Sequence, residues 1–131
     1  MSVRIANDGP SEATAAALAA AVRFNAAFNG RDVDAIMAAM TDDPVFEGTS
    51  PPDGDRYEGS AAVRAYWERF FAAARETWFD AEEIAMAGDR AVVRWRYTWL
   101  ATDGSRGHVR GVDVLRVRDG LIAEKLAYVK G

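Results

Sequence analysis

The sequence predicts one α+β domain in which three helices come before a bent antiparallel sheet. Amphipathic, alanine-rich or aromatic stretches fill most of the chain before residue 76. Runs of β-branched and aromatic residues fill residues 90–131, and Asp103-Gly104 and Asp119-Gly120 separate them. Asp-Gly between alternating apolar residues is a strong local signal for a β-hairpin. Helices segregated from such a meander indicate the α+β class.

Composition excludes several kinds of site. The 131 residues suit one domain, and the net charge of −4 argues against a nucleic-acid-binding surface. Without cysteine there are no thiolate nucleophiles or Cys-ligated metals, and one histidine, His108, leaves no metal site to predict. No apolar run is long enough to span a membrane, and residues 1–10 lack the apolar core of a signal peptide. The expected compartment is the cytoplasm.

The first half of the chain divides into an arm and two helices. Residues 1–10 are polar and interrupted by Gly9-Pro10, so we expect a mobile arm, with a single domain over residues 11–131. The alanine-rich run 11–30 is strongly helical and ends at Asn29-Gly30 as a left-handed cap. Asp32 caps a second short helix over residues 33–40.

The middle of the chain alternates short elements. Residues 44–48 form a short strand, and 49–59, with two prolines and two glycines, form a loop at the rim of a cavity. Residues 60–76 form a third helix whose aromatic stripe packs on the sheet. Residues 78–89 form a strand that leads into the meander.

The last hairpin brings two opposite charges together. Arg118-Asp119-Gly120 fits a three-residue loop with Gly120 in the left-handed region, which sets Asp113 opposite Lys125. Opposed residues share one face of a sheet, so this acid and this cation are expected to be neighbours.

The chain resembles the NTF2-like superfamily, in its SnoaL-like and ketosteroid-isomerase-like bacterial branch. Three runs carry the resemblance: RFNAAFNGRDVDAIMAAMTDDPVFEG, YEGSAAVRAYWERFF and GVDVLRVRDGLIAEKLAYVKG. The resemblance implies a cone-shaped roll with an apolar pocket at its wide end, and it directs Asp113 into that pocket. It does not decide the activity, since related proteins are isomerases, cyclases, hydrolases or non-catalytic binders.

The orientation of the strand over residues 90–101 is open to two interpretations. Successive side chains of a strand point to opposite faces, so Trp95, Tyr97 and Trp99 share one face and Arg96 and Thr98 the other. Hydrophobicity alone would direct the aromatics inward. When the spacing back from Asp113 is matched to the family, Arg96 and Thr98 are instead expected to point inward. An outer row of Trp95, Tyr97 and Trp99 would then be buried in a homodimer.

The family's best-known catalytic sets are incomplete here. Gly48 and Phe24 stand where a ketosteroid isomerase has its base and its tyrosine, so only the acid at Asp113 matches. Glu47 would replace that base only if a bulge turned it inward. An epoxide hydrolase of the limonene type would match at Arg96 but not at the positions of its two aspartates, Thr98 and Ala127.

The predicted site is therefore an acid with two cations, Asp113, Lys125 and Arg96, and no cofactor or metal. The ligand pocket is expected to be lined by Phe24, Phe46, Tyr66, Thr98, Leu115 and Ala127. One hypothesis is acid–base chemistry on an apolar, carbonyl-bearing small molecule, with Asp113 handling the proton. The alternatives are a non-catalytic binding or scaffold dimer, in which the Asp113–Lys125 pair is structural, and an epoxide hydrolase with a rearranged site.

Overall fold

The computed structural model describes residues 4–7, as backbone only, and residues 12–131. In chain order its elements are β1 (Arg4–Asn7), α1 (Glu12–Asn29), α2 (Val33–Ala38), β2 (Met40–Glu47), β3 (Arg56–Glu58), α3 (Ser60–Ala72), β4 (Ala74–Ala87), β5 (Arg90–Ala101), β6 (Arg106–Arg118) and β7 (Leu121–Val129). The predicted α+β class and the three helices are confirmed. None of the helices in these residues has the length and apolar character needed to cross a membrane.

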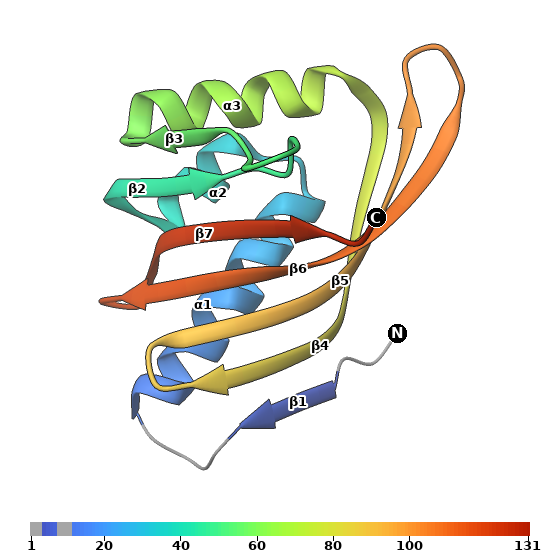
Figure 1. The fold of residues 1–131 in the computed structure, drawn as a ribbon. Helices are drawn as coiled ribbons and strands as arrows, with labels where there is room; N and C mark the ends of the chain where they lie inside the picture. Colours follow the sequence, from blue (N-terminus) through green and yellow to red (C-terminus); the bar gives the residue numbers. More distant parts are fainter. Residues whose placement is uncertain (1–3, 8–11) are drawn as a thin grey trace.

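The strands form one sheet in the order β1-β4-β5-β6-β7-β2-β3 (Figure 1). The four central strands pair in antiparallel fashion, as expected. Two other pairs are parallel, β1 with β4 and β2 with β7, so the sheet is mixed and not purely antiparallel. Residues Arg4–Asn7, inside the stretch expected to be a mobile arm, thus pair with the edge of β4, while the rest of that stretch lies outside the described residues.

Two predicted boundaries in the middle of the chain were wrong. The stretch expected to be a loop contains β3, which pairs with the end of β2. The strand expected to begin at Pro44 already begins at Met40, and its pairing with β7 is irregular between Met40 and Val45. Proline has no N–H to donate, so the irregularity around Pro44 lets one strand continue through it.

Helix α1 packs on the inner face of the sheet through small residues. Its buried positions include Ala17, Ala21, Phe24 and Phe28, spaced at three and four residues as a helix face requires. Val22 lies off this face and is 51% exposed. The predicted left-handed cap also moves by one residue, to Arg31, which has φ 54°.

The hairpin between β6 and β7 has a different turn from the predicted one. Arg118 pairs with Leu121, which leaves a two-residue loop in which Asp119 and Gly120 both have positive φ. This geometry suits Asp-Gly and the twist of a hairpin. A bulge at Ala123 then shifts the register, so that Asp113 lies opposite Ala127 and Lys125 opposite Leu115. The predicted direct pairing of Asp113 with Lys125 was wrong, although both side chains remain on the inner face.

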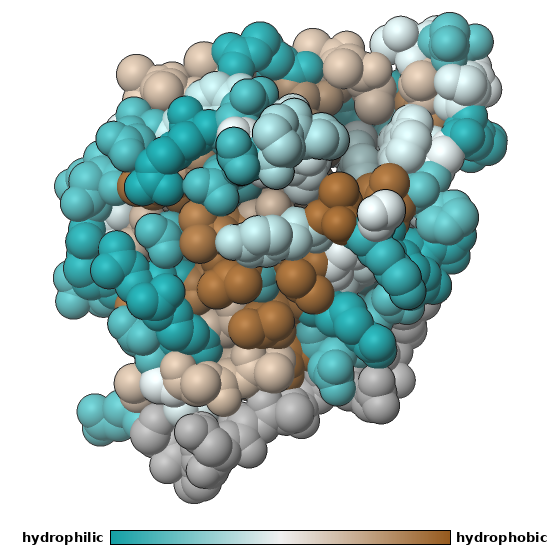
Figure 2. Space-filling view, viewed as in Figure 1, coloured by the Kyte–Doolittle hydropathy of each residue, from teal (hydrophilic) through white to brown (hydrophobic). Residues whose placement is uncertain are grey.

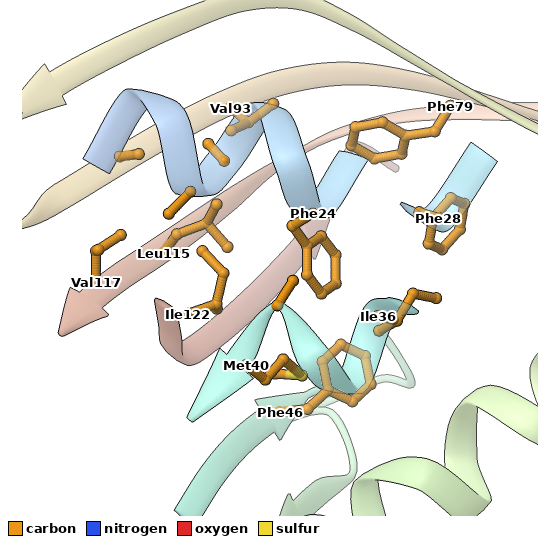
Figure 3. Packing of buried hydrophobic residues seen from close by; sticks show 14 of the residues in the cluster. Phe24, Phe28, Ile36, Met40, Phe46, Phe79, Val93, Leu115, Val117 and Ile122 are labelled. Atoms are coloured by element: carbon orange, nitrogen blue, oxygen red, sulfur yellow. The ribbon is translucent and has the colours of Figure 1, made fainter. Parts of the chain in front are cut away.

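The core fills the space between the sheet and α1. Figure 3 shows Phe24 of α1, Leu115 of β6, Ile122 of β7 and Phe46 of β2 pointing into a common interior. All four are nearly inaccessible to solvent. Burial of such side chains is the main contribution to stability, at about 1.5–3 kcal/mol each.

Candidate functional site

A cavity of about 260 Å³ lies between the inner face of the sheet and helices α1 and α3. Gly48 and Thr49, where β2 gives way to the loop that the sequence placed at a cavity rim, are among its lining residues. Its walls are mainly aromatic: Phe28, Phe46, Tyr66, Trp67, Phe70, Phe79, Trp95, Tyr97 and Trp99. An apolar pocket with a few polar groups is the usual form of a small-molecule site.

The aromatic side chains of β5 point into this cavity, and Arg96 points away from it. Trp95 is 5% exposed, and Tyr97 and Trp99 line the cavity with it. Arg96 lies on the outer face, in register with Asp80 of β4 and Arg110 of β6. The placement of Arg96 in the pocket was therefore wrong. A buried face selects the apolar half of an alternating strand, and that half is the aromatic one.

Two glycines of β6 make room for the indole rings. Gly111 lies opposite Trp95 and Gly107 opposite Trp99. A Cβ on Gly111 would come within 2.7 Å of the Trp95 ring, and one on Gly107 within 2.8 Å of a Trp99 ring atom. Both rings therefore lie across β6 where a larger residue would exclude them.

The acid and the cation predicted from the last hairpin do meet in the cavity. Lys125 Nζ donates a 2.8 Å hydrogen bond to Asp113 Oδ2, and both residues line the cavity. Asp113 is 1% and Lys125 5% exposed. Removal of two charges from water costs several kcal/mol per ion, and their mutual attraction offsets this cost only when the geometry is good.

Aromatic rings surround the ammonium group of Lys125. Its Nζ lies 5.1–6.0 Å from the ring centroids of five residues on four elements: Phe24, Phe28, Phe46, Trp67 and Phe79. At these distances a ring face attracts a cation. In residues 12–131 the one hydrogen-bond acceptor recorded for this ammonium group is Asp113.

Three buried polar atoms of the cavity residues have no hydrogen-bond partner among the described residues. They are Asp113 Oδ1, Trp67 Nε1 and Trp95 Nε1. Buried polar atoms are paired in the great majority of cases, so each such exception calls for an explanation. Here the three belong to residues that line one cavity, and they comprise an acceptor and two donors.

Two tyrosine hydroxyls add further donors. Burial raises the pKa of Tyr66 to about 12, and burial also raises the pKa of Tyr97 to about 12. Both residues line the cavity. At neutral pH each phenol is therefore protonated and able to donate a hydrogen bond.

The remaining predicted pocket residues divide into three groups. Phe46, Tyr66 and Ala127 line the cavity as expected. Phe24 and Leu115 are buried at 1% exposure in the core behind it. Thr98 lies beside outer-face hollows with Arg106, so its placement in the pocket was wrong.

Two other candidates lie away from the cavity. Glu47 follows the buried Phe46 and points outward, with a carboxylate oxygen 3.5 Å from Arg56 Nη1, so no bulge turns it inward. His108 is exposed on the outer face of β6, in register with Thr98. Among the described residues, no group of three or more His, Asp or Glu side chains is placed to hold a metal ion.

The predicted dimer contacts were also wrong. Trp95, Tyr97 and Trp99 face the cavity, so they cannot form an interface on the outer face. Figure 2 shows an apolar patch among polar side chains on the face turned away from α1. The exposed apolar residues of the chain include Val92 and Tyr128, both on outer-face strand positions.

Comparison with solved structures identifies the fold. An NTF2-like protein of unknown function from Mesorhizobium loti is 38% identical, with a TM-score of 0.79 over 98% of this chain and 100% of the other. A Mycobacterium tuberculosis protein in complex with estradiol-17β-hemisuccinate is 29% identical, with a TM-score of 0.76 over 86% and 92% of the chains. A SnoaL-like polyketide cyclase from Jannaschia, so named provisionally, is 19% identical, with a TM-score of 0.80 over 94% and 91%.

No curated protein matches the chain significantly. The SnoaL-like domain family matches residues 21–125, which contain α2, α3 and both members of the Asp113–Lys125 pair. The protein with the cavity between α1, α3 and a bent sheet is therefore a member of the SnoaL-like domain family, with the NTF2-like fold.

Proposed function

We propose that the protein binds a small, apolar, carbonyl-bearing molecule in the inner-face cavity and performs cofactor-free acid–base chemistry on it. The bent sheet and the helices would enclose a cone whose wide end is the mouth of this cavity. The observation that carries the proposal is Asp113: one carboxylate oxygen binds Lys125, and the other is buried beside an aromatic cavity with no hydrogen-bond partner in the described part of the chain.

Asp113 is the proton-handling group in this proposal. A carboxylate can take a proton from the carbon next to a carbonyl, and the negative charge then moves to the carbonyl oxygen as an enolate. Asp113 becomes neutral in this step, so the ammonium of Lys125 is left to balance the negative charge of the enolate. The protonated hydroxyls of Tyr66 and Tyr97, which line the same cavity, are donors suited to the enolate oxygen.

The aromatic walls support a flat, apolar ligand. Offset and edge-on contacts between rings contribute about 0.5–1.5 kcal/mol beyond burial of their area. The ligand of the M. tuberculosis neighbour, estradiol-17β-hemisuccinate, is a polycyclic molecule of this general shape. The position of Arg96 on the outer face removes the cation on which an epoxide-hydrolase interpretation depended.

The proposal is tested with 2-tetralone, a two-ring ketone with acidic protons next to its carbonyl. Proton NMR in D₂O follows the exchange of these protons for deuterium. We expect the wild-type protein to accelerate exchange, and Asp113→Asn to reduce the acceleration about 10²–10⁴-fold, the usual contribution of a general base. The matched control is Arg96→Gln, which changes a charge on the outer face and should leave exchange unchanged.

A second variant removes ambiguity about folding. The double substitution Asp113→Leu with Lys125→Met removes both charges and keeps the side chains of similar size, so it should remain folded. If this folded variant, or Asp113→Asn, exchanged the protons as fast as the wild type, Asp113 would not be the base. A wild-type rate equal to that of buffer would favour the non-catalytic binding alternative.

A further inference from the structure

The choice of lysine at position 125 differs from the usage in the rest of the chain. The sequence contains 14 arginines and two lysines, Lys125 and Lys130. Lys130 is exposed, whereas Lys125 is 5% exposed and lies on the cavity wall. For a purely structural ion pair with a carboxylate, the planar guanidinium of arginine is the better partner. Lysine is the cation whose amine can lose its proton and act as a nucleophile.

The surroundings of Lys125 favour such a nucleophile. Five aromatic rings lie within 6.0 Å of its Nζ, and the residue is 5% exposed, so few groups near the amine can solvate its charge. Desolvation in an apolar pocket is one of the ways in which proteins activate a lysine amine. A base for its proton is already in contact, since Asp113 Oδ2 accepts the 2.8 Å hydrogen bond from Nζ. Transfer of that proton turns two buried ions into two neutral groups, which lowers the desolvation cost of the pair.

We propose that Lys125 is a covalent site, which captures an apolar aldehyde or ketone in the cavity as an imine. This inference rests on the proposed function, because it requires that a carbonyl compound enter the same cavity. It goes further in assigning to Lys125 a bond to the ligand, where acid–base chemistry alone needs only its charge.

The step balances without any group outside the site. Asp113 takes a proton from the ammonium, and the neutral amine adds to the carbonyl carbon, whose oxygen receives a proton from the nitrogen. Asp113 then returns its proton to the resulting hydroxyl, the carbon–oxygen bond breaks, and water leaves as the carbon–nitrogen double bond forms. The products are a protonated imine on Lys125, ionised Asp113 and one water. The buried charge pair is therefore restored at the end of the step.

The structure also limits the class of carbonyl compound. Apart from Asp113, aromatic rings surround the ammonium, and the cavity walls beyond them are aromatic. A charged sugar or an α-keto acid would lose its hydration on entering the cavity. Among the described residues that line the cavity, no cation other than Lys125 is available to compensate for that loss. Flat, uncharged aldehydes and ketones are the class that the walls accept.

Reductive trapping tests the proposal. The wild-type protein is incubated with 6-methoxy-2-naphthaldehyde and sodium cyanoborohydride, which reduces an imine to a stable amine. Intact-mass measurement and peptide mapping then locate the label. We expect a single adduct on Lys125 within the time in which Lys130 and the N-terminal amine remain mostly unlabelled. Lys130→Arg should leave the labelling unchanged, and the Asp113→Leu, Lys125→Met double variant should lose it.

Labelling of Lys130 at the same rate as Lys125, or no label on Lys125, would refute the proposal that Lys125 forms an imine. A separate measurement distinguishes failure of the imine proposal from failure of the proposed function. The corresponding alcohol, 6-methoxy-2-naphthalenemethanol, has the same rings but cannot form an imine. Binding of this alcohol in the cavity and Asp113-dependent exchange of 2-tetralone protons, without trapping, would refute the imine and leave the proposed function standing. Absence of both binding and exchange would refute the two together.

Discussion

Lys125 and Asp113 form their 2.8 Å hydrogen bond as diagonal neighbours in the β6–β7 ladder, not as a directly opposed pair. Asp113 lies opposite Ala127, and Lys125 lies opposite Leu115. Diagonal positions on one face of a sheet are within reach of a long side chain. The contact thus depends on the bulge at Ala123 and on the length of lysine, and it places both charges against the cavity.

This ion pair makes the two charges interdependent for stability. Asp113→Asn leaves the buried Lys125 ammonium without its counter-charge, and we expect it to reduce the free energy of unfolding by about 3–5 kcal/mol. The double variant Asp113→Leu, Lys125→Met should be close to the wild type, because an apolar pair of similar volume carries no buried charge. Urea denaturation of the wild type, Asp113→Asn and the double variant measures both differences in the free energy of unfolding. A double variant as unstable as Asp113→Asn would show that the loss comes from packing and not from the unpaired charge.

The glycines under the indole rings give a second prediction. Gly111→Ala would place a Cβ against the Tyr128 carbonyl oxygen and the Trp95 ring, so we expect destabilisation of about 1–3 kcal/mol. Gly107→Ala should cost less, because its Cβ meets the Trp99 side chain, which is only half-buried and can move. Chemical denaturation of the two variants compares them. An equal effect at both positions would mean that the Tyr128 carbonyl imposes no constraint.

The buried phenols predict how stability depends on alkaline pH. The folded protein holds the protons of Tyr66 and Tyr97 up to about pH 12, whereas in the unfolded chain these tyrosines lose them near the usual pKa of 10.0. Between these values the unfolded state binds fewer protons, so the free energy of unfolding falls as the pH rises from about 10 to about 12.

Two measurements check this dependence. Tyrosinate absorbance in the folded protein should show two of the four tyrosines titrating last. Urea denaturation across the same range should show a steeper loss of stability in the wild type than in Tyr66→Phe. Equal slopes in the two proteins would contradict the assigned burial of Tyr66.

The sequence was sufficient for the elements but not for the face of β5. Hydrophobic periodicity located α1 and α3, and the Asp-Gly pairs located both hairpins of the meander. The same turn rule, applied at Asp103-Gly104, would have paired residue 101 with residue 105 and set Val93 opposite Asp113, as observed. That register directs Trp95 inward. The prediction instead followed the spacing matched to the family, which favoured Arg96 inward.

The predicted register of the last hairpin was wrong for a different reason. A two-residue and a three-residue loop are both compatible with Arg118-Asp119-Gly120, and no residue type signals the bulge at Ala123. The shift changed which residues are opposed but not which face they share, so Asp113 and Lys125 could still be predicted as neighbours. The convergence of rings from α1, β2, α3 and β4 around Lys125 depends on contacts between elements far apart in the chain, which hydrophobic periodicity does not reveal.

The tryptophans can show whether a ligand enters the inner-face cavity. Three of the four line the cavity, and Trp78 is exposed on the outer face, so Trp78→Phe leaves only cavity indoles as fluorophores. We predict that 2-tetralone quenches the fluorescence of Trp78→Phe saturably, and that adding Ala127→Phe, which fills the cavity, abolishes the quenching. Adding Arg96→Gln should leave it unchanged. Saturable quenching that survives Ala127→Phe, or no quenching at all in Trp78→Phe, would show that the inner-face cavity is not the ligand site.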